Sequence, residues 1–354
     1  MFLTLIIFII ILAILILVHE FGHFVVAKKS GVRVDEFGFG FPPKLFSWKK
    51  GETRYSINLV PLGGFVKIYG EQGEGKGEKN SFMSKSISRR AMIIASGVLM
   101  NFVLAIFLFS LGNFIGAPTV IDNEILFPDA KVRDIKVQII GVMQQSPAEK
   151  AGFMAGDILV DANTPESFQN FVSANQGKEI GIRVKRGAET LNLKVVPERI
   201  PEGIGARIGV SIDRTGIVSY SWWKSIYKGI QDTIDFIVLI VVTLAEVIHK
   251  AFLGEQVGEV LTGPIGIYNI TAQAAGMGFI YLIQLTALIS INLGLINILP
   301  FPALDGGRLL FLAIEKIKGS PVSQRVENAA HAVGFALLIL LMIFITWRDI
   351  VRFF

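Results

Sequence analysis

The chain begins with an apolar run that ends in a cluster of ionisable side chains. Residues 1–18 contain one polar residue, Thr4, and His19-Glu20-Phe21-Gly22-His23 follows directly. On a helix, residues i and i+4 share a face, so the two imidazoles can bind one metal ion while Glu20 stays free to accept a proton from metal-bound water. The H-E-x-x-H pattern also arises by chance. An ionisable residue near the bilayer centre costs about 2.5 to 3.5 kcal/mol on insertion scales, however, so this position favours a function.

Composition identifies a polytopic membrane protein. Of the 354 residues, 52% are hydrophobic, and the mean hydropathy is +0.56, which is too apolar for an ordinary soluble protein. The net charge of +5 comes from basic residues at the edges of apolar segments, which the positive-inside rule explains, so we expect no nucleic-acid partner. The chain has no cysteine, so a metal site must use histidine, aspartate or glutamate.

Four segments are long and apolar enough to span a membrane: the N-terminal run and, approximately, residues 91–116, 276–299 and 329–347. The first has no basic leading region and no small-residue cleavage site, so we expect it to persist as a membrane helix. The stretch 226–252 carries several charged residues, which predicts an amphipathic helix that lies on or dips into the membrane surface. Residues 24–90 hold 13 Lys/Arg and six Asp/Glu, which places this loop in the cytoplasm and the N-terminus outside.

Residues 118–225 have the composition of a soluble domain, and two membrane crossings place them outside the cytoplasm. We expect a capped helix at 146–152, a strand near 158–160, a second helix at 165–174, and a hairpin with strands at 182–185 and 190–195. This order of elements, together with the SPAEKAG segment and the AGD turn, resembles a PDZ domain. An unrelated small α/β domain is the alternative.

Asp305 is the strongest candidate for a third metal ligand. It lies in NILPFPALDGG at 297–307, where prolines and glycines break the helix at membrane depth, and broken backbone there must line a protein-walled cavity. If 226–252 does not span, the third span runs in the same direction as the first, and Asp305 reaches the depth of His19 and His23. A protease-type zinc site uses three protein ligands and a water. His331 is the rival ligand, although capping or packing is the commoner role for a lone histidine near a helix end.

Several motifs, taken in order, resemble the site-2 protease family of the bacterial RseP type: HEFGH, GFGF, PLGGFVK, SFMSKSISRRAMIIASGVLMNF, SPAEKAG, LTGPIGI and SINLGLINILPFPALDGGRLLF. The resemblance implies that His19, His23 and Asp305 bind zinc and that Glu20 is the general base and later the general acid. It also implies that a membrane-reentrant sheet and the loop before Asp305 bind unwound substrate, through Gly63, Gly64, Phe65, Asn297, Pro300 and Pro302.

Two features depart from the usual pattern of that family. Gly97-Val98 stands ahead of Asn101 where Gly-Pro is usual, which affects a helix bend and removes no catalytic group. Residues 118–225 have room for a single PDZ domain, whereas relatives often carry two. The chemistry that the resemblance implies is therefore unchanged, while the role of the domain outside the membrane is less constrained.

The expected fold is a polytopic α-helical membrane protein with four transmembrane helices, a membrane-reentrant β-hairpin or sheet, and an inserted extracytoplasmic PDZ-like α/β domain. Residues 1–117 and 276–354 form the two halves of the membrane core, 118–225 the PDZ-like domain, and 226–275 an amphipathic linker with the GPIGI motif. The expected function is that of a zinc metalloendopeptidase of the bacterial cytoplasmic membrane. Its expected substrates are single-span membrane proteins, such as an anti-sigma factor, or signal-peptide remnants.

Two other functions compete with proteolysis. The first is a catalytically inactive membrane adaptor with a structural metal site, whose PDZ domain contacts a substrate or a regulatory protein. Glu20 disfavours it, because a structural zinc site has no use for a carboxylate that is not a ligand. The second is metal-ion transport, which needs polar groups distributed across the membrane, whereas here they cluster at one depth.

Overall fold

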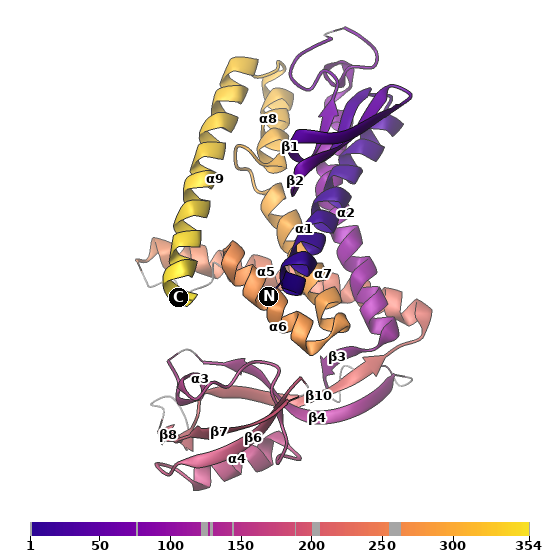
Figure 1. The fold of residues 1–354 in the computed structure, drawn as a ribbon. Helices are drawn as coiled ribbons and strands as arrows, with labels where there is room; N and C mark the ends of the chain where they lie inside the picture. The colour runs from indigo at the N-terminus through magenta and orange to yellow at the C-terminus, as the bar shows by residue number, and fades with distance from the viewer. Residues whose placement is uncertain are drawn as a thin grey trace. The chain divides into compact units, whose positions relative to one another are not determined.

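The computed structural model describes residues 2–75, 77–121, 127, 130–143, 145–187, 189–199, 206–254 and 263–353 (Figure 1). The described chain divides into two compact units. One consists of Met1–Phe109, Gly229–Ala272 and Gln284–Phe354, and the other of Ser110–Lys228 and Gln273–Ile283. Each unit has hydrophobic clusters of its own. The domain boundaries expected from the sequence stay a prediction.

Within the described residues, four helices are long and apolar enough to cross a membrane: α1 (Phe2–Lys29), α2 (Ile87–Ile115), α7 (Phe279–Ile298) and α9 (Gln324–Phe353). They correspond to the four predicted spans. The third span begins at Phe279 and not near residue 276, because Gly278, with φ of 122°, separates α7 from the preceding helix α6 (Pro264–Met277). Gly278 adopts this left-handed backbone without steric penalty because it has no Cβ atom.

Helix α5 (Trp222–Phe252) is continuous over 31 residues and is not among the four candidate spans, as the sequence predicted. Phe236, Ile237 and Ile240 on one face pack against α2 and α7. Val238, Leu239, Val241 and Val242 are exposed. The packed face joins α5 to the helical unit, while the exposed apolar face is typical of a helix that lies against lipid.

The GPIGI motif forms the start of α6. The Gly266 backbone N–H donates a hydrogen bond to Oδ2 of Asp349, which is buried in the last turns of α9, at 3.0 Å. A carboxylate at this place satisfies a backbone donor that a helix N-terminus leaves free. Leu261 and Thr262, which open the longer LTGPIGI motif, lie outside the described residues.

The predicted sheet beside the first helix is formed by β1 (Val34–Lys50) and β2 (Thr53–Ile68). The pairing is irregular, and residues 36–39 have two sets of partners, at 54–57 and at 64–67. The Pro-Leu-Gly-Gly segment at 61–64 does not end β2, which continues to Ile68, and the irregularity is taken up as shifts of register. Whether this sheet enters the membrane stays a prediction. A short 3-10 turn, η1 (Phe82–Ser84), leads from the following loop into α2.

The second unit contains a mixed domain. Among the described residues, six strands form one sheet in the order β3-β10-β4-β5-β6-β7. Their bounds are Ala117–Val120, Val210–Ser219, Lys131–Val142, Ile158–Leu159, Ile180–Arg186 and Glu189–Val195. The short strands β8 (Glu198–Arg199) and β9 (Ala206–Arg207) pair with each other.

Several elements of this domain were predicted from local sequence. Helix α3 (Pro147–Lys150) is capped by Ser146, whose hydroxyl accepts a hydrogen bond from the Glu149 N–H. Helix α4 (Pro165–Ala174) has the predicted bounds and a capping box at Thr164. The hairpin β6–β7 is also confirmed, although Ala188 in its turn lies outside the described residues. Apolar residues of the sheet and of α4, such as Val137, Ile139, Phe168 and Val172, form the core. The likeness to a PDZ domain itself stays a prediction.

Candidate metal centre

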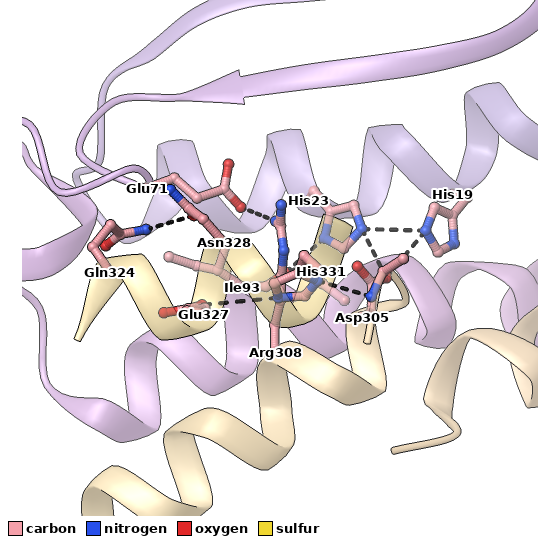
Figure 2. Close-up of polar contacts among 12 residues, drawn as sticks. His19, His23, Glu71, Ile93, Asp305, Arg308, Gln324, Glu327, Asn328 and His331 are labelled. Atoms are coloured by element: carbon pink, nitrogen blue, oxygen red, sulfur yellow. Dashed lines mark hydrogen bonds and ion pairs between the residues drawn. The ribbon is translucent and has the colours of Figure 1, made fainter. Parts of the chain in front are cut away.

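Three predicted ligands meet at one point in the first unit (Figure 2). His19 and His23 lie one turn apart on α1, and Asp305 is the first residue of α8 (Asp305–Lys318). The Asp305 Oδ2 atom is 3.2 Å from Nε2 of each histidine, and the two Nε2 atoms are 3.3 Å apart. Among the described residues, the ligand atoms of these three side chains lie close enough together to hold one metal ion.

The triangle fits a tetrahedral zinc ion. Zinc bonds to histidine nitrogen or carboxylate oxygen are about 2.0 to 2.1 Å long, so two ligand atoms of a tetrahedral site are about 3.3 to 3.4 Å apart. The observed separations of 3.2 and 3.3 Å are close to that value. Asp305 Oδ2 is buried and makes no hydrogen bond of good geometry within the described chain. A cation in this position would satisfy it.

The Asp305 carboxyl group has the protonation state that a ligand needs. Its burial acts to raise the pKa, but the adjacent His19 and His23 rings outweigh this effect and hold the pKa below its ordinary value. The group is therefore an ionised carboxylate at neutral pH. A carboxylate oxygen with two imidazole nitrogens is a donor set that zinc favours.

Both histidines are oriented by α2. The His23 Nδ1–H donates a hydrogen bond to the backbone oxygen of Ile93 at 2.9 Å. The Asn101 side-chain amide lies 3.1 Å from His19 Nδ1, and this asparagine is fully buried. Its Oδ1 atom otherwise lacks a partner, and rotation of the amide by half a turn lets Oδ1 accept the Nδ1–H. In both cases Nε2 remains free to bind a metal.

Glycines allow α1 and α2 to approach this closely. A Cβ atom at Gly97 of α2 would lie 2.3 Å from His23 Nε2 and 2.8 Å from His19 Cε1. A Cβ atom at Gly22 of α1 would lie 2.3 Å from the Ser96 backbone oxygen. Neither glycine was predicted to be part of the site, since their role depends on how two distant helices cross.

Glu20 lies in the same cavity but outside the ligand triangle. The cavity has a volume of about 390 Å³, and its walls include the three ligands, Glu20, and residues 64–66 of β2. A Cβ atom at Gly64 would lie 3.1 Å from Glu20 Cγ, so the strand runs directly beside the glutamate. Glu20 and this part of β2 therefore share one cavity with the three metal-ligand candidates.

The residues expected to bind substrate are divided between two places. Gly64 and Phe65 line the cavity, and Gly63 precedes them in β2. Asn297 lies near the end of α7 and is half-buried, while Pro300 and Pro302 belong to the loop that joins α7 to Asp305. These last three residues are not part of the cavity wall.

Glu71 and Arg308 are cavity residues that the sequence did not reveal. Residues 70–79 are rich in Gly, Glu and Lys, a composition typical of a solvated loop. The Glu71 side chain is nevertheless only 19% exposed and forms an ion pair with Arg308 of α8 (Figure 2). Burial raises the pKa of the Glu71 carboxyl group, and the Arg308 guanidinium opposes this shift without cancelling it. A recognisable signal was the position of Arg308, which lies three residues after Asp305 on the same helix.

A zinc-type ligand triangle beside a glutamate, between helices long enough to cross a membrane, defines the site of a membrane metalloprotease. Residues 7–341 match Peptidase family M50, and the chain belongs to that family. It is a zinc metalloprotease of the site-2 type that acts in regulated intramembrane proteolysis.

Relatives match along nearly their full length. The zinc metalloprotease RasP of Oceanobacillus iheyensis is 32% identical over 99% of both chains. The regulator of sigma-W protease RasP of Bacillus subtilis is 32% identical over 99% of both. The regulator of sigma-E protease RseP of Escherichia coli is 32% identical over 98% of both. The first alignment extends over 448 positions although this chain has 354 residues, so that relative carries residues that this chain lacks.

Proposed function

We propose that His19, His23 and Asp305 are the zinc ligands of an intramembrane endopeptidase and that Glu20 is its general base. The observation that carries the proposal is the ligand triangle, with separations of 3.2 to 3.3 Å, in a cavity that Glu20 also lines. The two hydrogen-bonding positions on α2 support the assignment, because they leave both Nε2 atoms facing Asp305.

The chemistry divides between the metal and the glutamate. Zinc, when bound, lowers the pKa of a coordinated water and polarises the substrate carbonyl. Glu20 would accept the proton of the attacking water and later donate it to the leaving amine. Ile93 and Asn101 hold the imidazoles in the tautomer that ligation needs.

The edge of β2 is the proposed place for the substrate backbone. A helical substrate keeps its scissile carbonyl within intrahelical hydrogen bonds and must unwind before attack. Pairing with residues 63–65 would replace the lost hydrogen bonds, since an exposed strand edge can add an extended peptide. Gly64 supports this placement because it lies against Glu20. We assign Asn297, Pro300 and Pro302 to later contacts with the unwound segment, on the strength of the family resemblance alone.

We further propose that the substrates are single-span proteins of a bacterial cytoplasmic membrane. Two relatives carry names that describe regulation of sigma-W and sigma-E, which supports a membrane-bound anti-sigma factor as a substrate. Signal-peptide remnants are a second candidate substrate, because they too are single apolar segments in the membrane. The basic loop 24–90 supports an orientation with the N-terminus outside the cytoplasm.

Residues 118–225 are proposed to form one extracytoplasmic PDZ-like domain that contacts a substrate or a regulatory protein. The order of α3, β5, α4 and the β6–β7 hairpin supports this interpretation. The longer alignment with RasP is consistent with a single such domain here and additional sequence in that relative.

The decisive experiment replaces Glu20 by Gln in the full-length protein. We expect cleavage of a single-span reporter to be lost, while zinc content and thermal stability stay near those of the wild type. Glu246→Gln on the exposed part of α5 is the matched control, and it should leave cleavage unchanged. Turnover that survives Glu20→Gln would refute the assignment. A wild-type protein that binds the reporter but never cleaves it would favour the inactive adaptor.

A further inference from the structure

His331 on α9 is a half-buried histidine that the proposed chemistry does not use. It is not part of the ligand triangle. Its Nδ1 atom accepts a hydrogen bond from the backbone N–H of Ala303 at 2.8 Å. An imidazole that accepts at Nδ1 is neutral and carries its hydrogen on Nε2. Ala303 stands two residues before Asp305, and both His331 and Asp305 are drawn in Figure 2.

The backbone at Ala303 needs support from its surroundings. Its φ angle is +80°, in the left-handed region that residues with a Cβ atom rarely adopt. Such a conformation persists only when neighbouring structure holds it. The hydrogen bond to His331 provides one such constraint, at the residue where the chain turns towards α8.

A second residue of α9 contacts the same loop. Gly334 lies three residues after His331 and therefore on the same face of the helix. A Cβ atom at Gly334 would lie 2.3 Å from the Pro302 backbone oxygen, so α9 approaches this loop with no side chain between them. The His331 ring also packs on Phe311 of α8, with ring centroids 5.6 Å apart. Helix α9 thus contacts the chain on both sides of Asp305.

We propose that His331 is a positioning residue for the metal centre, which acts by holding the Ala303 N–H and so fixing the turn that presents Asp305. The inference rests on the proposed zinc ligation by Asp305. An ion pair with Glu327 is the competing role, but the His331 Nε2 and Glu327 Oε1 atoms are 4.0 Å apart, beyond hydrogen-bond distance.

Two substitutions separate positioning from packing. His331→Asn keeps an acceptor close to the place of Nδ1, whereas His331→Leu keeps much of the volume and has no acceptor. Zinc affinity is measured by competition with a chelator in the full-length protein, and Co²⁺ absorption reports the coordination geometry. We expect His331→Leu to weaken zinc binding about 10- to 100-fold, as loss of an outer partner of a metal ligand does. His331→Asn should retain most of the affinity and the wild-type Co²⁺ spectrum.

Several outcomes would overturn the proposal. These are wild-type zinc affinity in His331→Leu, an equal loss in the Asn and Leu variants, and a loss in Glu327→Gln as large as that in His331→Leu. If the Leu variant does not fold, His331→Gln takes its place. The glutamine side chain places its acceptor near the position of Nε2 and not of Nδ1, so zinc affinity should be as low as expected for His331→Leu. Asp305→Ala tests the underlying assignment independently, since undiminished zinc affinity there would refute ligation by Asp305 whatever the His331 variants do.

Discussion

Replacement of Gly97 by Ala tests whether the crossing of α1 and α2 sets the metal geometry. The new Cβ atom would lie 2.3 Å from His23 Nε2, whereas ordinary contact begins near 3.4 Å. The ring would therefore retreat by about 1 Å, while ligand distances in a metal site tolerate only about 0.2 Å. The clash could also be relieved if α1 and α2 moved apart. That movement would displace Ile93, whose backbone oxygen accepts the hydrogen bond from His23 Nδ1.

The expected loss is larger for zinc than for the fold. Overpacking of a close contact costs about 1 to 3 kcal/mol, and the better helix propensity of alanine returns about 1 kcal/mol. The free energy of unfolding should thus fall by at most about 2 kcal/mol. Zinc affinity should fall at least about 100-fold, the upper range for loss of an outer partner, because a ligand itself is displaced.

The assay compares chelator competition with thermal unfolding followed by circular dichroism. Gly112→Ala on the same helix is the control, since its Cβ atom would meet its nearest described neighbour, Ile280 Cδ1, only at 3.9 Å. It should bind zinc like the wild type. If Gly97→Ala also binds zinc with wild-type affinity and cleaves a reporter, the proposed ligand geometry is wrong.

Two further predictions concern buried polar contacts of the same unit. Asn101→Ala removes the partner of His19 Nδ1 and should weaken zinc binding about 10-fold or more in the chelator assay; unchanged affinity would show that Asn101 does not orient the ring. Glu315→Ala leaves the Arg90 guanidinium, whose side chain is 6% exposed, without its carboxylate. The free energy of unfolding should fall by about 3 to 5 kcal/mol with little change in the zinc affinity of the folded protein, and a change of less than 1 kcal/mol would mean that water replaces the lost partner.

Local patterns in the sequence predicted much of the fold. Long apolar runs indicate spans because a helix must match the thickness of the bilayer. The bounds of α4 and the alternation of the β6–β7 hairpin around its turn were predicted in this way. Each of these signals is confined to neighbouring residues, which is why they could be recognised without a tertiary structure. The predicted start of the third span, near residue 276, differs from the observed start of α7 at Phe279. The sequence does not show which backbone conformation a glycine adopts within an apolar run, so the break at Gly278 could not be predicted.

For the metal centre too, the local sequence predicted some features and only the tertiary structure shows the others. The spacing of His19 and His23 on one helix determined half of the ligand set, and the direction of the spans pointed to Asp305. Only the tertiary structure shows what Gly97, Asn101 and His331 contact, because these contacts cross 70 or more residues of chain or are made through the backbone of another element. Hydropathy and spacing carry no information on which faces of two helices meet. Packing decides that, and with it which residues orient the ligands that the sequence names.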